Sequence, residues 1–290
     1  MPVQQDPRSP SVRRRRLSAE LRRARKVSGL TTGEASKRAK ISVGKLSMIE
    51  NSEIQTVKPD DLDKLLTIYK VEDSDKRDVL HQLARDAKIR GWWSKYKDVF
   101  KDESLPDFEA EASTMRTYQS QVFPGLLQTP SYTHALLQGG RFTDPKAIER
   151  KVEARMARRE ILTRFDPVRL RAIIDEAAFY RPIGGPKVRL DQHRHLLHMA
   201  QMPHIDIQVL PFSKGPHAGL SGPFIILDFP NPLDTPIVCV PTLTDALYLE
   251  QPEDVETYST VFGDVQGSAI SAAESAEYIT ERIKTLESTQ

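Results

Sequence analysis

Ile41–Asn51, ISVGKLSMIEN, decides how the N-terminal part of this chain folds. Ser42 is a suitable N-cap for the helical pattern that follows it, in which Leu46 and Ile49 lie three residues apart on one face. A shorter helix is predicted over residues 31–39, so only two residues separate the pair. Two short helices joined by so tight a turn, the second with polar and basic residues facing outward, indicate a helix-turn-helix.

Three further helices are predicted around this pair, over residues 13–27, 59–69 and 73–87, which gives an all-α domain over residues 13–90. Residues 1–12 contain three prolines and few apolar side chains, which predicts a disordered arm. Residues 91–104, with adjacent tryptophans at Trp92 and Trp93, are predicted to be a linker or an interdomain helix.

The run from Arg13 to Tyr69 resembles the Xre family, whose members are built like the lambda and 434 repressors. The recognition helix of that family ends in a pattern close to I/V-S-x-I/L-E-N-G. The corresponding residues here are Leu46, Ser47, Ile49, Glu50 and Asn51, with Leu46 at the I/V position and Ser52 where the family has glycine. The resemblance implies a lambda-repressor-like domain that binds double-stranded DNA.

The charge of the chain is unevenly distributed. Residues 1–58 hold 14 Lys and Arg against five Asp and Glu, a net charge of +9, whereas the remainder has a net charge of −7. Arg13–Arg16 fall at the start of a predicted helix, where the helix dipole disfavours positive charge. This placement indicates an external anion, either DNA phosphate or a minor-groove edge, although a merely solvated basic helix is the alternative.

The family pattern implies which residues meet the DNA. Val43, Gly44 and Met48 occupy positions that usually read bases, and Thr32 stands where many relatives hold a phosphate with glutamine. Three further residues occupy positions that usually contact the DNA backbone: Ser42, Lys45 and Asn51. The complete predicted DNA-binding set is Arg13, Arg14, Arg15, Arg16, Thr32, Ser42, Val43, Gly44, Lys45, Ser47, Met48 and Asn51.

The three base-reading positions depart from the usual chemistry. Base readout normally uses Arg, Lys, Asn or Gln, each paired contact contributing roughly 1–3 kcal/mol of discrimination. Val43, Gly44 and Met48 offer no such hydrogen bonds, but they suit contact with thymine methyl groups. We therefore expect weak or A·T-leaning readout, assisted by DNA shape. The alternative is that operator specificity is lost and the module binds protein.

Residues 105–290 have a different pattern, typical of a mixed α+β domain, and we expect this domain to serve as the effector and dimerisation domain. Strands are predicted within residues 111–128 and at 170–174, 205–212, 223–229 and 237–243. Helices are predicted at 129–137, 144–163, 186–200 and 255–285. The runs EAEASTMRTYQSQVFPGLLQT, DEAAFYRPIGG and VLPFSKGPHAGLSGPF resemble the effector domain of the actinomycete Scr-type antitoxin-like regulators. That resemblance implies a cytoplasmic transcription regulator, often paired with a small partner protein encoded nearby.

Enzyme-like patterns in this region favour structural interpretations. His193, His195 and His198 share a helical segment with Asp191, but no cysteine or H-E-x-x-H spacing accompanies them. The glycine-rich run GPHAGLSG, with His217 and Ser221, lacks the spacing of a phosphate loop or a nucleophile elbow. The adjacent carboxylates of Asp175 and Glu176 would point oppositely in extended chain. We expect no catalytic residue, no metal and no cofactor.

Composition agrees with an intracellular protein. The sequence has no run of eighteen apolar residues, so we expect no membrane-spanning helix. The N-terminal arginines are not followed by the apolar segment of a signal peptide. Cys239 is the single cysteine, which fits a reducing compartment. The leading hypothesis is a cytoplasmic, homodimeric, sequence-specific regulator that binds promoter or operator DNA and senses a partner protein or ligand. The alternatives are an antitoxin-like module that sequesters a small partner protein, and an enzyme hidden in the second domain.

Overall fold

The computed structural model describes residues 10–54, 56–87, 92–100, 105–140, 144–231, 234–243 and 245–288. By contact, the chain divides into two units, Met1–Lys95 and Tyr96–Gln290, and each is described by itself. Most of the predicted N-terminal arm, residues 1–9, lies outside the described residues. So do residues 91 and 101–104 of the predicted linker and residues 88–90 at the end of the predicted helical domain.

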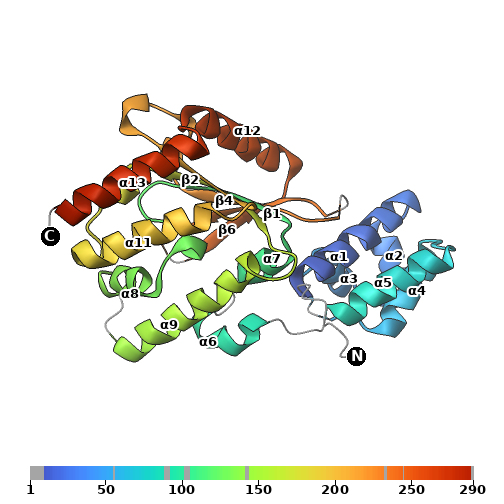
Figure 1. The fold of residues 1–290 in the computed structure, drawn as a ribbon. Coiled ribbons are helices and arrows are strands. Elements are labelled where there is room, and N and C mark those ends of the chain that lie inside the picture. The colour runs from blue at the N-terminus through green and yellow to red at the C-terminus, as the bar shows by residue number, and fades with distance from the viewer. Residues whose placement is uncertain are drawn as a thin grey trace. The chain divides into compact units, whose positions relative to one another are not determined.

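The described part of the N-terminal unit folds as a small helical domain (Figure 1). Its helices are α1 (Pro10–Val27), α2 (Thr32–Ala39), α3 (Val43–Glu50), α4 (Pro59–Ile68) and α5 (Ser74–Asp86). All five predicted helices are therefore confirmed, α2 to α5 within one residue at each end. The first begins at Pro10, three residues earlier than predicted, so Arg13–Arg16 lie in its second turn rather than at its start. The shared core includes Leu17, Leu21, Leu46, Ile49, Leu62, Leu65 and Leu66.

Local capping explains where these helices begin. Thr31 and Glu34 form a reciprocal capping box at α2, with the Glu34 amide donating to Thr31 Oγ1 at 3.3 Å and the Thr31 amide to Glu34 Oε2 at 2.8 Å. Asp73 accepts the amides of Asp75 and Lys76 at the start of α5. Pro59 occupies the first turn of α4, where its missing N–H has no helical partner to lose.

The C-terminal unit is built on a mixed six-stranded sheet, which confirms the α+β class (Figure 1). The strand order is β3-β2-β1-β4-β5-β6. Strands β1 (Thr114–Gln119), β2 (Arg169–Asp175) and β3 (Ile205–Leu210) run parallel, whereas β4 (Phe224–Asp228), β5 (Ile237–Pro241) and β6 (Ala246–Leu249) extend the sheet antiparallel. Strand β6 was not predicted from the sequence, because it is only four residues long and its side chains are only partly buried.

Helices cover both faces of the sheet. Helix α12 (Pro252–Ser268) packs with Phe262 and Val265 on Tyr118, Ile173 and Phe224. Helix α11 (Gly185–Ala200) contacts β3 and α13 (Ala272–Ser288). The remaining described helices are α6 (Lys97–Phe100), α7 (Leu105–Glu111), α8 (Pro130–Gln138), α9 (Pro145–Arg158), α10 (Ala177–Tyr180) and the 3₁₀ turns η1 (Trp92–Tyr96), η2 (Gly125–Leu127), η3 (Arg159–Leu162), η4 (Phe212–Lys214) and η5 (Ala218–Ser221). No helix in the described ranges is long and apolar enough to cross a membrane.

The single helix predicted over residues 255–285 is wrong. The chain leaves the helix after Ser268, and the Ile270 amide donates to Val209 O at 3.0 Å on the outer edge of β3. Ser271, the residue before α13, then forms a capping box with Glu274. The segment between the two helices therefore pairs with part of the outer edge of β3, where backbone groups would otherwise lack hydrogen-bond partners.

Candidate DNA-binding site

The turn between α2 and α3 is held by backbone and side-chain hydrogen bonds. Lys40 adopts a left-handed conformation with φ +55°, and the Ile41 amide donates back to Ser36 O at 3.2 Å. Ser36 Oγ donates to Ile41 O at 2.6 Å, and Ser42 Oγ accepts the Lys45 amide at 3.2 Å. Ser42 is thus the N-cap of α3, as predicted. The two helices have the tight connection of a helix-turn-helix.

The C-terminal end of α3 is anchored to α1 and α4. The Arg25 guanidinium donates Nε and Nη2 to the Glu50 carboxylate at 2.8–3.1 Å, and Tyr69 Oη donates to Glu50 Oε1 at 3.2 Å. The hydrogen bonds that Arg25 donates to the Glu50 carboxylate raise the pKa of Arg25. Burial, and then the charge of Glu50, raise the pKa of Tyr69. Arg22 donates to Glu50 O and, at 2.8 Å, to Asn51 Oδ1. These bonds fix the orientation of α3.

The predicted base-reading residues lie on the open side of this anchored helix. Leu46 and Ile49 are buried, whereas Val43 and Met48 are 53% and 43% exposed. A Cβ built on Gly44 meets nothing within 4 Å. The structure therefore brings Val43, Gly44 and Met48 to one solvent-facing surface. Base reading by these residues stays a prediction.

Several predicted backbone contacts already have partners inside the unit. Lys45 Nζ forms an ion pair with Asp61 Oδ2 at 2.5 Å, and Asn51 Nδ2 donates to Ser47 Oγ at 3.3 Å. Thr32 is half-buried in the first turn of α2. DNA contact by these residues stays a prediction.

The arginine run is also part of the folded unit. Arg13 Nη1 lies 3.6 Å from Asp86 Oδ2, and its side chain is only 6% exposed. Arg14, Arg15 and Arg16 are partly buried. Four exposed cations lie in or near the two central helices and were not among the predicted DNA contacts: Lys37, Arg38, Lys40 and Lys58. A count of charged positions opposite the apolar stripe would have found them.

Ser52 adopts a left-handed backbone conformation, which favours glycine and explains why the family pattern has glycine at this position. Its φ is +63°, its amide donates to Ile49 O, and the Glu53 amide donates to Met48 O, which together form a Schellman motif at the end of α3. A left-handed conformation costs a non-glycine residue about 1 kcal/mol.

Ser52→Gly is therefore expected to raise the free energy of unfolding by roughly 0.5–1 kcal/mol. Thermal unfolding followed by circular dichroism measures the change. Ala19→Gly, at an exposed helical position of α1, serves as the control and should lower stability by a similar amount. A lower midpoint for Ser52→Gly would show that the left-handed turn is not retained in solution.

The enzyme-like residues of the C-terminal unit enter separate hydrogen-bond networks. Asp175 accepts Tyr118 Oη at 3.3 Å, and its Oδ2 lies 3.8 Å from His217 Nε2, whose loop joins β3 to β4. Glu176 instead accepts the Phe212 amide and Tyr278 Oη at 2.6 and 3.0 Å. The two neighbouring carboxylates therefore point into different surroundings, as expected from the sequence.

The histidines of α11 are likewise held by local contacts. His193 Nδ1 pairs with Arg189 O at 2.5 Å, and His195 Nε2 with Arg159 Nη2 at 2.9 Å. Burial lowers the pKa of both imidazoles to about 4, so both are neutral at pH 7. Across the described residues, no group of three His, Cys, Asp or Glu side chains is arranged to hold a metal ion.

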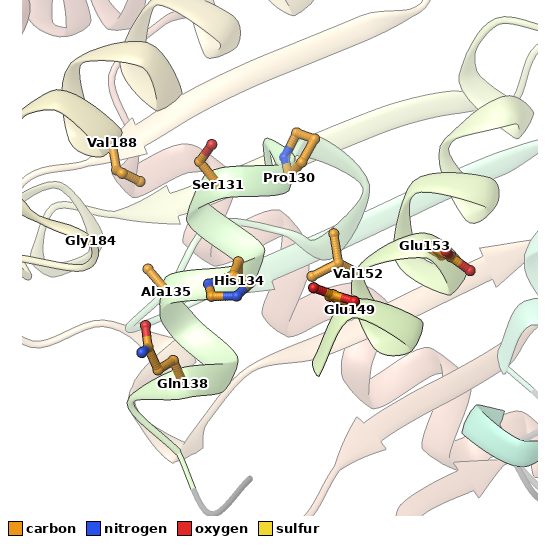
Figure 2. Close-up of a pocket in the computed structure, with 10 residues that line it drawn as sticks. All are labelled: Pro130, Ser131, His134, Ala135, Gln138, Glu149, Val152, Glu153, Gly184 and Val188. Atoms are coloured by element: carbon orange, nitrogen blue, oxygen red, sulfur yellow. The ribbon is translucent and has the colours of Figure 1, made fainter. Parts of the chain in front are cut away.

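A hollow of about 650 Å³ opens between α8, α9 and the start of α11 (Figure 2). His134 and Gln138 come from α8, and Glu149 and Glu153 from α9. Gly184 forms one wall with φ +74°, and a Cβ there would lie 2.6 Å from Val188. This hollow was not predicted from the sequence, because its lining comes from three separate segments without a shared motif.

The anchored α3 and its open outer surface define the chain as a helix-turn-helix DNA-binding regulator with an additional C-terminal α+β domain. Residues 16–80 match the family model described as a helix-turn-helix domain. Residues 103–281, more than half of the chain, match the family described as "Domain of unknown function (DUF5753)", and the chain belongs to that family. Comparison with curated proteins and comparison with solved structures each returned no match.

Proposed function

We propose that the chain is a sequence-specific transcription regulator that occupies promoter or operator DNA with α3. The observation that carries this proposal is the position of Val43, Gly44 and Met48 on the open side of a helix whose other side is fixed by Glu50. In helix-turn-helix proteins the second helix enters the major groove, and its first residues meet base edges. The exposed cations Lys37, Arg38 and Lys58 supply charge for the flanking phosphates.

The type of regulator and the role of the C-terminal domain form the second part of the proposed function. We propose an Xre-type regulator acting in the cytoplasm as a homodimer, because one short helix contacts too few base pairs to be selective. The C-terminal domain would form the dimer and sense a ligand or a partner protein. The hollow beside His134, Glu149 and Glu153 supports a ligand site. The separate surroundings of Asp175 and Glu176 support a role without catalysis.

The test is a binding selection from random duplex DNA with the full chain. A regulator enriches a common sequence, and a dimer enriches two inverted half-sites with centres about 10 base pairs, or a multiple of that, apart. A single unrepeated half-site would contradict the dimer, and a pool that stays random would contradict sequence-specific binding.

The second candidate is an antitoxin-like module that sequesters a small partner protein encoded nearby. It is favoured by the exposed apolar side chains of Val43 and Met48, which suit a protein surface as well as DNA. Co-purification with the product of the neighbouring gene, in the absence of DNA, tests it. A stable complex that forms equally with Val43→Ala and Met48→Ala would place the partner elsewhere.

A further inference from the structure

The polar side chains of α3 have partners within the N-terminal unit. Lys45 pairs with Asp61, Ser42 Oγ caps the helix, and Ser47 Oγ accepts from Asn51. The two serine hydroxyls can still donate a proton, but a single hydroxyl accepts or donates to several bases and discriminates weakly among them. The residues that usually make paired hydrogen bonds to bases are therefore replaced on this helix by apolar ones.

Apolar residues form a large part of the accessible surface of α3. Val43 and Met48 expose about half of their side chains although α3 also has a buried face formed by Leu46 and Ile49. Gly44 lies four residues before Met48, so the two share a stripe along the helix. The stripe is open and lacks a side chain at Gly44, with Val43 on an adjacent part of the helix surface.

Nothing within the folded unit requires glycine at position 44. Its backbone is helical, and an added Cβ would meet nothing within 4 Å. Glycine weakens a helix relative to alanine, so the residue lowers stability without relieving any internal contact. The missing side chain instead leaves room for a molecule outside the unit to come close to the backbone.

We propose, on the basis of the DNA-binding function above, that α3 reads thymine through its C5 methyl group. In the major groove that methyl is the apolar feature that distinguishes base pairs, and apolar side chains contact it directly. Val43 and Met48 pack on these methyl groups, and Gly44 lets the groove edge approach the helix. Because burial of one methyl-sized group changes binding by about fourfold, each contacted thymine contributes about that factor.

The test replaces thymine by deoxyuridine, which removes the methyl group and keeps the base-pairing and acceptor groups. In a duplex obtained by selection with the full chain, each thymine is replaced in turn and affinity is measured. We expect about fourfold weaker binding at the contacted positions. Val43→Ala and Met48→Ala should each abolish the thymine preference at one set of positions. Val79→Ala, a valine 50% exposed on α5, is the matched control and should retain it.

Gly44→Ala adds a second, independent readout. The thermal midpoint should rise, because alanine is the better helix former, while affinity for the selected duplex falls. A selected sequence bound equally well with uracil at every position would overturn methyl readout and leave the regulator function standing. A selection that enriches no sequence would overturn both.

Discussion

Glu50→Ala is expected to lower the free energy of unfolding of the N-terminal unit by about 3–5 kcal/mol. The Glu50 side chain is 5% exposed and that of Arg25 is 13% exposed, so removal of the carboxylate leaves a largely buried guanidinium and the Tyr69 hydroxyl without this partner. Removing one member of a buried pair costs more than the pair itself contributes, because the remaining charge stays poorly solvated.

Hydrogen exchange of peptides from residues 10–87 measures this change within the unit. Glu53→Ala, at an exposed neighbouring glutamate, is the control and should change the free energy by less than about 0.5 kcal/mol. The double variant Arg25→Ala with Glu50→Ala should lose less than the sum of the single losses. Additive losses would mean that the two side chains do not act as a pair.

Lys45→Ala and Asp61→Asn are expected to change DNA affinity in opposite directions. Lys45 is 37% exposed and lies 2.5 Å from Asp61, so its charge is partly neutralised in the free protein. Removal of a phosphate contact by Lys45→Ala should weaken binding roughly tenfold and reduce the slope of log K against log salt by about 0.9. Asp61→Asn frees the ammonium group and should strengthen binding.

The matched control for this pair is Lys76→Ala on α5, where the lysine pairs with Glu20 outside the helix-turn-helix. It should leave the salt slope unchanged. A structural role for Lys45 alone predicts a different result: both Lys45→Ala and Asp61→Asn would lower stability, and neither would alter the slope.

The N-terminal fold was accessible from the sequence because its determinants are local. Ser42 caps α3, Pro59 begins α4, and the apolar period fixes which residues turn inward. The pairs Lys45–Asp61 and Arg25–Glu50 were not accessible, because their members lie 16 and 25 residues apart and no local pattern joins them. These pairs decide which polar groups remain for DNA.

The C-terminal domain was predicted only in outline. Buried runs such as IVCV identify strands, but they do not show how the strands pair. That β1 lies between β2 and β4 became clear only from the structure. The break before α13 carried a readable signal in Ser271 and Glu274, a capping box that a long helical pattern concealed. The hollow between α8 and α9 depends on tertiary packing and had no signal.

A salt titration of binding by the full chain tests the central claim most directly. One duplex contains the DNA upstream of the protein's own gene, and the other contains the same bases in scrambled order. The account predicts tighter binding to the upstream DNA, with affinity falling steeply as salt rises. Equal, weak binding to both duplexes would contradict sequence recognition by Val43, Gly44 and Met48.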